Sequence, residues 1–176
     1  MPRETAGFAF VCAAAVGIVP LAAAAALTDA SRLGPDGVGP IVFGTTPAQA
    51  AATGTAFEHG KPAPGSTCYY LRPSAPSGLT LLVEDGNIRR ADVVSQAIAT
   101  TDGFKVGEPV SKLMAFFGAR AQTSPDKYDP QVKTITVAPK EGHDARGRTV
   151  YKVKHGTISK IIAGLRPQVG YVEGCG

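Results

Sequence analysis

Leu79-Thr-Leu-Leu-Val-Glu-Asp85-Gly86-Asn-Ile88 is the stretch of this sequence that says most about the fold. Apolar residues flank an Asp-Gly pair, and both residues of that pair tolerate the positive φ that a tight hairpin turn requires. The stretch Thr149-Val-Tyr-Lys-Val-Lys-His155-Gly156-Thr-Ile158 has the same layout, with His-Gly at the turn. Each stretch therefore predicts two antiparallel strands joined by a short turn.

A further strand and a short helix are expected before each hairpin. Residues 68–72 and 133–138 predict the additional strands. Further upstream, residues 47–53 and 109–117 each begin with Pro and are followed by Gly, the residues favoured at the first turn of a helix and just beyond its end. In the first of these helices, Thr46 and Gln49 have the spacing of a capping box. Between these elements, residues 59–67 and 122–130 are interpreted as linkers rich in turn-forming residues.

The order helix, strand, strand, strand thus occurs twice along the chain. We therefore expect an α+β fold of two tandem helix-plus-three-strand repeats with antiparallel sheet. The first repeat covers residues 27–101 and the second covers residues 102–176. A helix on three strands buries little core by itself. The two repeats are therefore expected to form one compact unit, either by sharing a sheet or by packing side by side.

Residues 1–26 have the order of a secretory signal peptide. Arg3 provides a short positive start, an apolar stretch runs from residue 7 to residue 21, and the alanines at 22–26 offer cleavage sites. The apolar stretch is shorter than the roughly 20 residues that a membrane-spanning helix needs. We expect an exported protein, periplasmic or extracellular, whose mature form has no transmembrane span. The alternative is a buried N-terminal helix.

Without this segment, two of the three cysteines remain, Cys68 and Cys175. An even number of cysteines in an oxidising compartment indicates a disulfide. Such a bridge would close a loop of about 107 residues, which chain-entropy arguments value at roughly 4–5 kcal/mol. The competing interpretation makes Cys68 a nucleophile with His59 as its base. Because Cys175 is next to the last residue, where a lone thiol would be exposed, the disulfide is the preferred interpretation.

The chain is 44% hydrophobic and 18% charged, with a net charge of +4. This composition indicates no particular function. The chain contains no serine-hydrolase elbow and no glycine-rich phosphate loop, and its three histidines lack the spacing of metal ligands. The sequence therefore indicates no catalytic residue, no metal site and no cofactor. The alternative is a small extracytoplasmic hydrolase whose site is assembled from the loop residues His143, Asp126 and Asp129.

A basic region extends from residue 127 to residue 166, with nine Lys or Arg and three Asp or Glu. Lys152 and Lys154 share one face of the predicted strand, because side chains alternate along a strand. The candidate binding residues in this region are Arg148, Tyr151, Lys152, Lys154 and Lys160. The alternative is a solvated face whose lysines protect a sheet edge.

This region favours a non-enzymatic binding module for an extracytoplasmic protein or an acidic envelope ligand. No nucleic-acid partner is expected, because aromatic residues are sparse among the basic ones. The sequence does not indicate the oligomeric state.

Two short stretches resemble known families. Ile-Val-Phe-Gly-Thr-Thr-Pro-Ala-Gln-Ala at 41–50, echoed at 104–115, resembles the start of the repeats in the β-lactamase inhibitory protein and SmpA/OmlA lipoprotein group. Tyr171-Val-Glu-Gly-Cys175 resembles the tail of a family of small, secreted, uncharacterised bacterial proteins. The resemblance implies a short helix packed on antiparallel strands, and an inhibitor-like or envelope-associated role. The chain departs from the group at Thr45, where Met is common, and it lacks a lipidated N-terminal cysteine.

Overall fold

The computed structural model describes residues 25–175, and the predicted signal peptide, residues 1–26, lies almost entirely outside them. The chain is part of the fold from Leu27 onward. The Leu27 side chain is 4% exposed, and its backbone N–H donates a 3.0 Å hydrogen bond to Oγ1 of Thr55.

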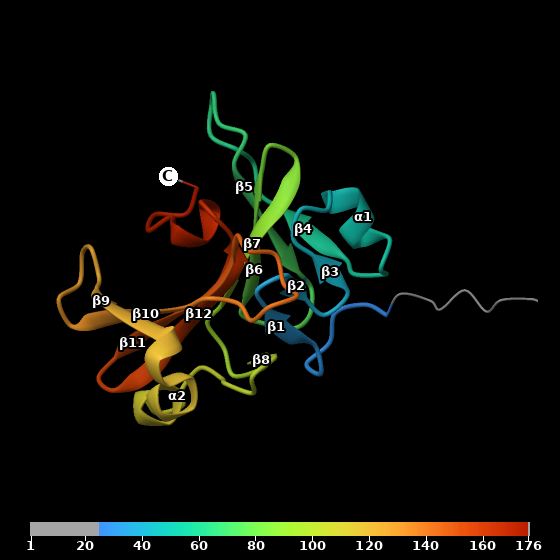
Figure 1. The fold of residues 1–176 in the computed structure, drawn as a ribbon. Coiled ribbons are helices and arrows are strands. Elements are labelled where there is room, and N and C mark those ends of the chain that lie inside the picture. Colours follow the sequence, from blue (N-terminus) through green and yellow to red (C-terminus); the bar gives the residue numbers. More distant parts are fainter. Residues whose placement is uncertain (1–24, 176) are drawn as a thin grey trace, which may run out of the picture.

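A single eight-stranded antiparallel sheet dominates the molecule (Figure 1). From one edge to the other, its strands are β4 (Phe57–His59), β5 (Tyr69–Pro73), β6 (Leu79–Glu84), β7 (Asn87–Val93), β12 (Thr157–Leu165), β11 (Gly147–Lys154), β10 (Val132–Val137) and β9 (Ala121–Pro125). At the centre, β7 pairs with β12, with Ala91 opposite Ala163. This central pair joins the two halves of the chain into one sheet.

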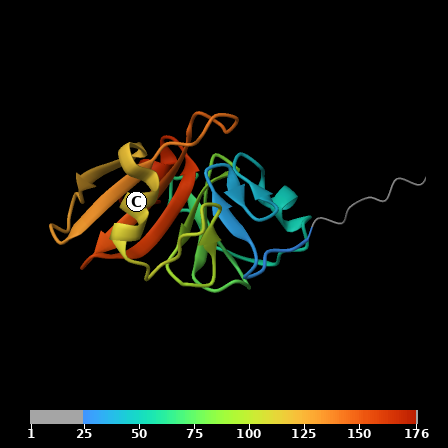
Figure 2. The ribbon, with the colours of Figure 1, turned by 60° about the horizontal axis from the view of Figure 1, so that its bottom comes forward.

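A smaller, four-stranded sheet packs against this centre, where β2 contacts β7 and β1 contacts β12. Its order is β3 (Ile41–Val42), β2 (Gly37–Val38), β1 (Arg32–Gly34) and β8 (Ala99–Thr100), and β1 and β8 are parallel. The helices are α1 (Pro47–Ala51), α2 (Val110–Phe117) and the short 3-10 turns η1 (Gly118–Arg120) and η2 (Gln168–Gly170). Figure 2 shows α1 beside the small sheet and α2 over the C-terminal half of the large one. Among the described residues, no helix is long and apolar enough to cross a bilayer.

The predicted α+β fold of two tandem helix-plus-three-strand repeats is wrong. The protein is mainly β, one sheet runs through both halves, and α2 is the only α-helix of seven or more residues in the described part of the chain. The parallel pairing of β1 with β8 also departs from the all-antiparallel expectation. The supposed linker at residues 122–130 contains most of the edge strand β9, and the one at residues 59–67 begins at the last residue of the edge strand β4. The residues of both strands are largely exposed and carry no apolar alternation. Edge strands of this kind leave little signal in a sequence.

Individual local elements were predicted correctly. Asp85 and His155 occupy the two hairpin turns with φ of 52° and 50°, and each is followed by Gly. The turns join β6 to β7 and β11 to β12 in the expected antiparallel registers. At the start of α1, Thr46 and Gln49 form the capping box.

The two faces of the large sheet have different surroundings. One face packs on the small sheet and on α2, and it carries the main core, including Leu81, Ile88, Tyr151 and Ile161. Along β11 the alternate residues Arg148, Val150 and Lys152 point to the opposite face. There Val150 and Ile162 form a second, small cluster with Val169 of η2. The segment from residue 166 to residue 175, here named the C-terminal segment, therefore covers part of that opposite face.

A disulfide between Cys68 and Cys175 fixes the C-terminal segment, with a Cα–Cα distance of 5.3 Å. The predicted bridge is thus confirmed, and Cys68 is not a free nucleophile. Beside it, the backbone N–H of Cys175 donates a 3.0 Å hydrogen bond to the hydroxyl of Tyr70. Near the start of the segment, the side-chain amide of Gln168 donates a 2.5 Å hydrogen bond to the carboxylate of Glu84. The segment is therefore attached to β6 and to the start of β5.

Candidate functional site

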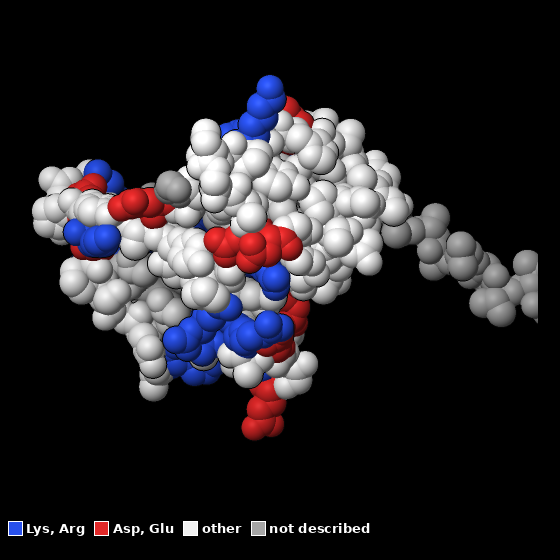
Figure 3. Space-filling view, turned by 90° about the horizontal axis from the view of Figure 1, so that it is seen from above, with Lys and Arg blue, Asp and Glu red and all other residues white. Residues whose placement is uncertain are grey.

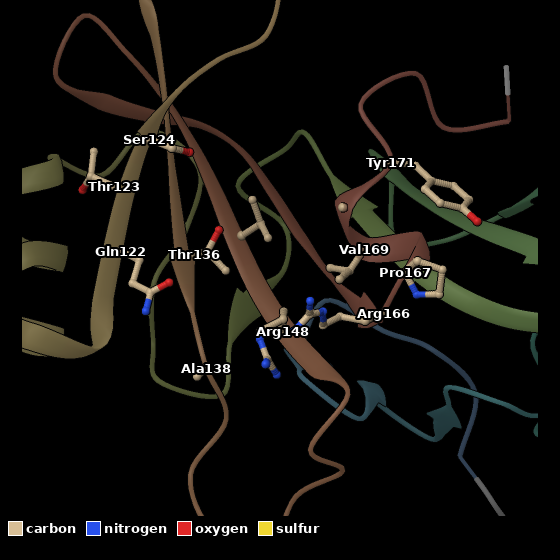
Figure 4. A pocket seen from close by; sticks show the side chains of 12 residues that line it. Gln122, Thr123, Ser124, Thr136, Ala138, Arg148, Arg166, Pro167, Val169 and Tyr171 are labelled. Atoms are coloured by element: carbon tan, nitrogen blue, oxygen red, sulfur yellow. The ribbon is translucent and has the colours of Figure 1, made fainter.

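A groove runs between the C-terminal segment and strands β9 to β12 (Figure 4). It lies on the face of these strands that points away from the main core, here named the outer face. It consists of two adjoining cavities of about 790 and 290 Å³. Both are lined by Ser124, Thr136, Val150, Val169, Gly170 and Tyr171. Thr136 and Val150 belong to the sheet, whereas Val169 and Tyr171 belong to the C-terminal segment. The groove therefore depends on the segment keeping its position over the sheet.

The lining of the groove is basic. Arg148 and Arg166 line the larger cavity, and Lys127 and Lys152 line the smaller one. Among the described residues, neither cavity is lined by Asp or Glu. Figure 4 shows Arg148 and Arg166 near the same end of the groove. More broadly, basic side chains gather in one large patch on the face seen in Figure 3, with acidic side chains at its border.

Arg148, which was predicted, and Arg166, which was not, differ from the predicted lysines because no carboxylate pairs with them in the described part of the chain. One guanidinium nitrogen of Arg148 donates hydrogen bonds of 2.8 and 2.6 Å to the carbonyl oxygens of Ala145 and Gly147. These bonds orient the side chain but leave its charge uncompensated. Arg166 is exposed, and it follows β12 at the mouth of the groove.

The three lysines predicted as binding residues each have an acidic partner. Lys152 lies 2.6 Å from Asp126, Lys154 lies 2.9 Å from Asp129, and Lys160 lies 3.3 Å from Asp92. These carboxylates are far from the lysines in sequence, so the lysines appear unpaired when the sequence is read alone. Their charges are largely balanced in the fold.

Tyr151, the fifth predicted binding residue, has an exposed fraction of 0% and lies in the main core beside Phe104 and Phe117. A ligand at the surface does not reach it, so the structure removes it from the candidate site. Burial raises the pKa of its phenol, which stays neutral at physiological pH.

Sequence reasoning missed Arg166. The alternation of β12 places Ile162 and Gly164 on the outer face, the same face as Arg148 and Val150 of β11, and continuing it one residue past the end of the strand places Arg166 there too. This alternation was available from the sequence. The groove itself was not, because its second wall is the C-terminal segment and only the fold brings that segment over the strands.

The residues suggested for a hydrolase are not gathered in one site. Asp126 and Asp129 lie before β10, and His143 lies after it, so a strand of six residues, or about 20 Å, separates them. His143 contacts Asp36 instead, through Nδ1 and the carboxylate. A hydrogen bond from Lys152 lowers the pKa of Asp126 to about 2, and one from Lys154 lowers the pKa of Asp129. Both carboxylates are therefore ionised at neutral pH and cannot donate a proton there.

Metal ligands are not grouped either. Within residues 25–175, no three or more His, Cys, Asp or Glu side chains are arranged to hold a metal ion. His59, the base considered for Cys68, lies at the exposed end of the edge strand β4.

No family model matches the chain, and no curated protein matches it significantly. Among solved structures, the fold has a neighbour. It is similar to the crystal structure of the uncharacterized protein YfeY from Escherichia coli. The two share 22% sequence identity over 77% of this chain and 99% of the YfeY chain, with a TM-score of 0.52. This likeness concerns the fold alone, and the resemblance to the β-lactamase inhibitory protein and SmpA/OmlA group stays a prediction.

Proposed function

We propose that the mature protein is an extracytoplasmic, non-enzymatic binding module that holds an acidic ligand in the groove beside the C-terminal segment. One observation carries the proposal. The described lining contains four basic side chains and no acidic one, and Arg148 and Arg166 have no carboxylate partner. The two unpaired guanidinium groups lie near the same end of the groove and repel each other, so an acidic ligand bound between them relieves the repulsion.

The neighbouring groups favour an acidic polypeptide segment. Guanidinium groups bind carboxylates with paired, charge-assisted hydrogen bonds. The hydroxyls of Ser124 and Thr136 and the amide of Gln122 offer further donors and acceptors along the floor. Val150 and Val169 add an apolar surface for aliphatic side chains between the acidic ones. A mixture of charge and apolar surface suits a polypeptide better than a uniformly polar polysaccharide.

Export is the second part of the proposal. Disulfides persist mainly in oxidising compartments, and the Cys68–Cys175 bridge supports a location outside the cytoplasm. Together with the predicted signal peptide, the bridge favours a periplasmic or extracellular protein.

Binding of a labelled peptide of alternating glutamate and valine tests the proposal by fluorescence anisotropy at low salt. The double variant Arg148→Glu/Arg166→Glu should weaken binding at least tenfold, because each charge-assisted hydrogen bond is worth about 1.5–3 kcal/mol. The matched control is Lys61→Glu/Lys105→Glu, which makes the same charge change at two exposed lysines that line neither cavity. The control should keep the affinity within about twofold.

Two results would overturn the proposed anion site, and a third would overturn the assignment of a polypeptide ligand. The first is failure of the wild-type protein to bind the peptide, and the second is equal loss in the two double variants. The third is binding of alginate, but not of the peptide, in a way that depends on both arginines. This last result would keep the groove as an anion site but replace the polypeptide with an acidic polysaccharide.

A further inference from the structure

A second large cavity lies beside α2, on the opposite face of the sheet from the groove. Its volume is about 600 Å³, within the range of small-molecule binding sites. Val110 and Met114 of α2 form one side, and Ile135 of β10 and Val153 of β11 form the floor. Among the residues that the structure describes, only Thr123, on the edge strand β9, lines both this cleft and the groove.

The cleft exists because α2 is too short to cover the outer strands. The helix has eight residues, and its buried side chains Leu113 and Phe117 pack into the main core. Val110 and Met114 stay half-buried at the border of that core. The face of β9 and β10 beyond the helix is therefore open, and apolar surface is left at the junction.

The rim of the cleft carries one positive charge and no negative charge among the described residues. Lys133 lies on the same face of β10 as Ile135, and it is exposed. No carboxylate in the described part of the chain lies within salt-bridge distance of it. The other polar groups at the rim are Gln131, Thr123 and His155. An apolar floor with a single free ammonium group at its rim is complementary to a molecule with an apolar body and one anionic end.

We infer that the cleft beside α2 binds a single-chain fatty acid. The hydrocarbon chain lies over Met114, Ile135 and Val153, where every buried methylene favours binding. The carboxylate lies against the ammonium group of Lys133. Met114 suits this role, because its flexible thioether side chain adapts to chains of different length and shape. The site is separate from the groove, so the inference does not depend on the proposed function.

Titration calorimetry with oleate at pH 8, below its aggregation concentration, tests the inference. The wild-type protein should bind one oleate per chain. Met114→Trp fills the cleft and should weaken binding at least tenfold, and Val110→Phe provides a second filling variant in case the first does not fold. Circular dichroism and thermal unfolding identify folded variants.

A second set of variants tests whether the carboxylate of the ligand lies against Lys133. Lys133→Gln should weaken oleate binding about tenfold but change the binding of oleyl alcohol less than twofold. Lys61→Gln, which removes an equivalent charge at an exposed lysine that lines neither the groove nor the cleft, should leave oleate binding unchanged. Absence of oleate binding, or equal binding by wild type and a folded filling variant, would overturn the inference. An equal effect of Lys133→Gln on oleate and oleyl alcohol would overturn the fatty-acid assignment and indicate a neutral ligand.

Discussion

The guanidinium group of Arg90 in β7 donates a 2.6 Å hydrogen bond to the carbonyl oxygen of Tyr171, 81 residues later in the chain. A second bond of 3.2 Å goes from the same nitrogen to the carbonyl oxygen of Gln168. The other side of the guanidinium group pairs with Asp92 at 2.8 Å, and only 2% of Arg90 is exposed. A buried ion pair thus holds the wall of the groove against the centre of the large sheet.

Loss of the Arg90 side chain should lower the stability of the protein. Arg90→Leu removes the hydrogen bonds to the C-terminal segment and leaves the buried Asp92 with only the more distant Lys160. We expect the free energy of unfolding to fall by about 3–5 kcal/mol, the usual cost of leaving a buried charge unpaired. Urea denaturation of the wild-type protein and the variant measures this difference in the free energy of unfolding. The matched control is Arg146→Leu, which breaks an exposed Arg–Asp pair of the same spacing and should cost less than about 1 kcal/mol. Equal losses in the two variants would contradict the assigned role of Arg90.

Removal of the disulfide should affect both stability and the groove. Cys68→Ser/Cys175→Ser frees the end of the C-terminal segment, and we expect unfolding to become easier by about 2–5 kcal/mol. Peptide binding should weaken as well, because the wall of the groove loses its covalent anchor. Unfolding of the wild-type protein with and without reductant provides the comparison. If the reduced protein, with both thiols titrated, matched the oxidised one in stability, the prediction would be wrong.

The Asp126–Lys152 pair predicts a defined loss of stability in acid. The folded-state pKa of Asp126 is about 2, below its ordinary 3.8, because Lys152 donates a hydrogen bond to the carboxylate. A lowered folded-state pKa means that the ionised carboxylate stabilises the fold. This contribution is complete above about pH 5 and is lost as the pH falls from about 4 to about 2.

Asp126→Asn removes that contribution. The difference in unfolding free energy between wild type and variant should be constant above about pH 5 and should shrink between about pH 4 and pH 2. Lys152→Met should reduce the same pH dependence by removing the largest cause of the lowered pKa, while the backbone hydrogen bond from Tyr128 to Asp126 remains. A difference between wild type and Asp126→Asn that stayed constant down to pH 2 would show that the pair does not lower this pKa.

Gly164 in β12 is required where the central strands come close together. A Cβ at this position would lie 2.5 Å from the carbonyl oxygen of Arg89 and 2.8 Å from Cα of Arg90. Because these are backbone atoms, Gly164→Ala must move a strand, and we expect a loss of about 1–3 kcal/mol in thermal or urea unfolding. Gly170→Ala is the control, since a Cβ there meets no atom within 4 Å, and its effect should stay within about 0.5 kcal/mol. Similar costs at the two positions would contradict this account.

The parts of the fold that could be predicted were those encoded in neighbouring residues. The hairpin turns at Asp85 and His155 follow from Gly in the next position and apolar residues on either side. The shared eight-stranded sheet depends on the pairing of β7 with β12, whose partners are about 70 residues apart and have no local signature. The strands of the small sheet, which have two or three residues each, are too short to show a period of two. Apparent repetition along the chain was therefore mistaken for two repeats in space.

The site was predictable only in part, for a similar reason. The sequence shows where basic residues are concentrated, but it does not show which acidic side chains neutralise them. Asp126 and Asp92 reach Lys152 and Lys160 only in the folded chain. Arg148 was identified from its place in the basic region. Arg166 follows from the alternation of β12, whereas the groove requires the C-terminal segment that the disulfide and Arg90 hold in place.

The central claim is that an acidic ligand binds in the groove between this segment and β9 to β12. Backbone amide NMR spectra of the mature protein, recorded while the glutamate–valine peptide is added at low salt, test it most directly. The account predicts shift changes concentrated at Thr136, Val150 and Val169 and their neighbours, weakening as salt is added and lost in Arg148→Glu/Arg166→Glu. Shift changes that scatter over the surface, or that persist in the double variant, would contradict it.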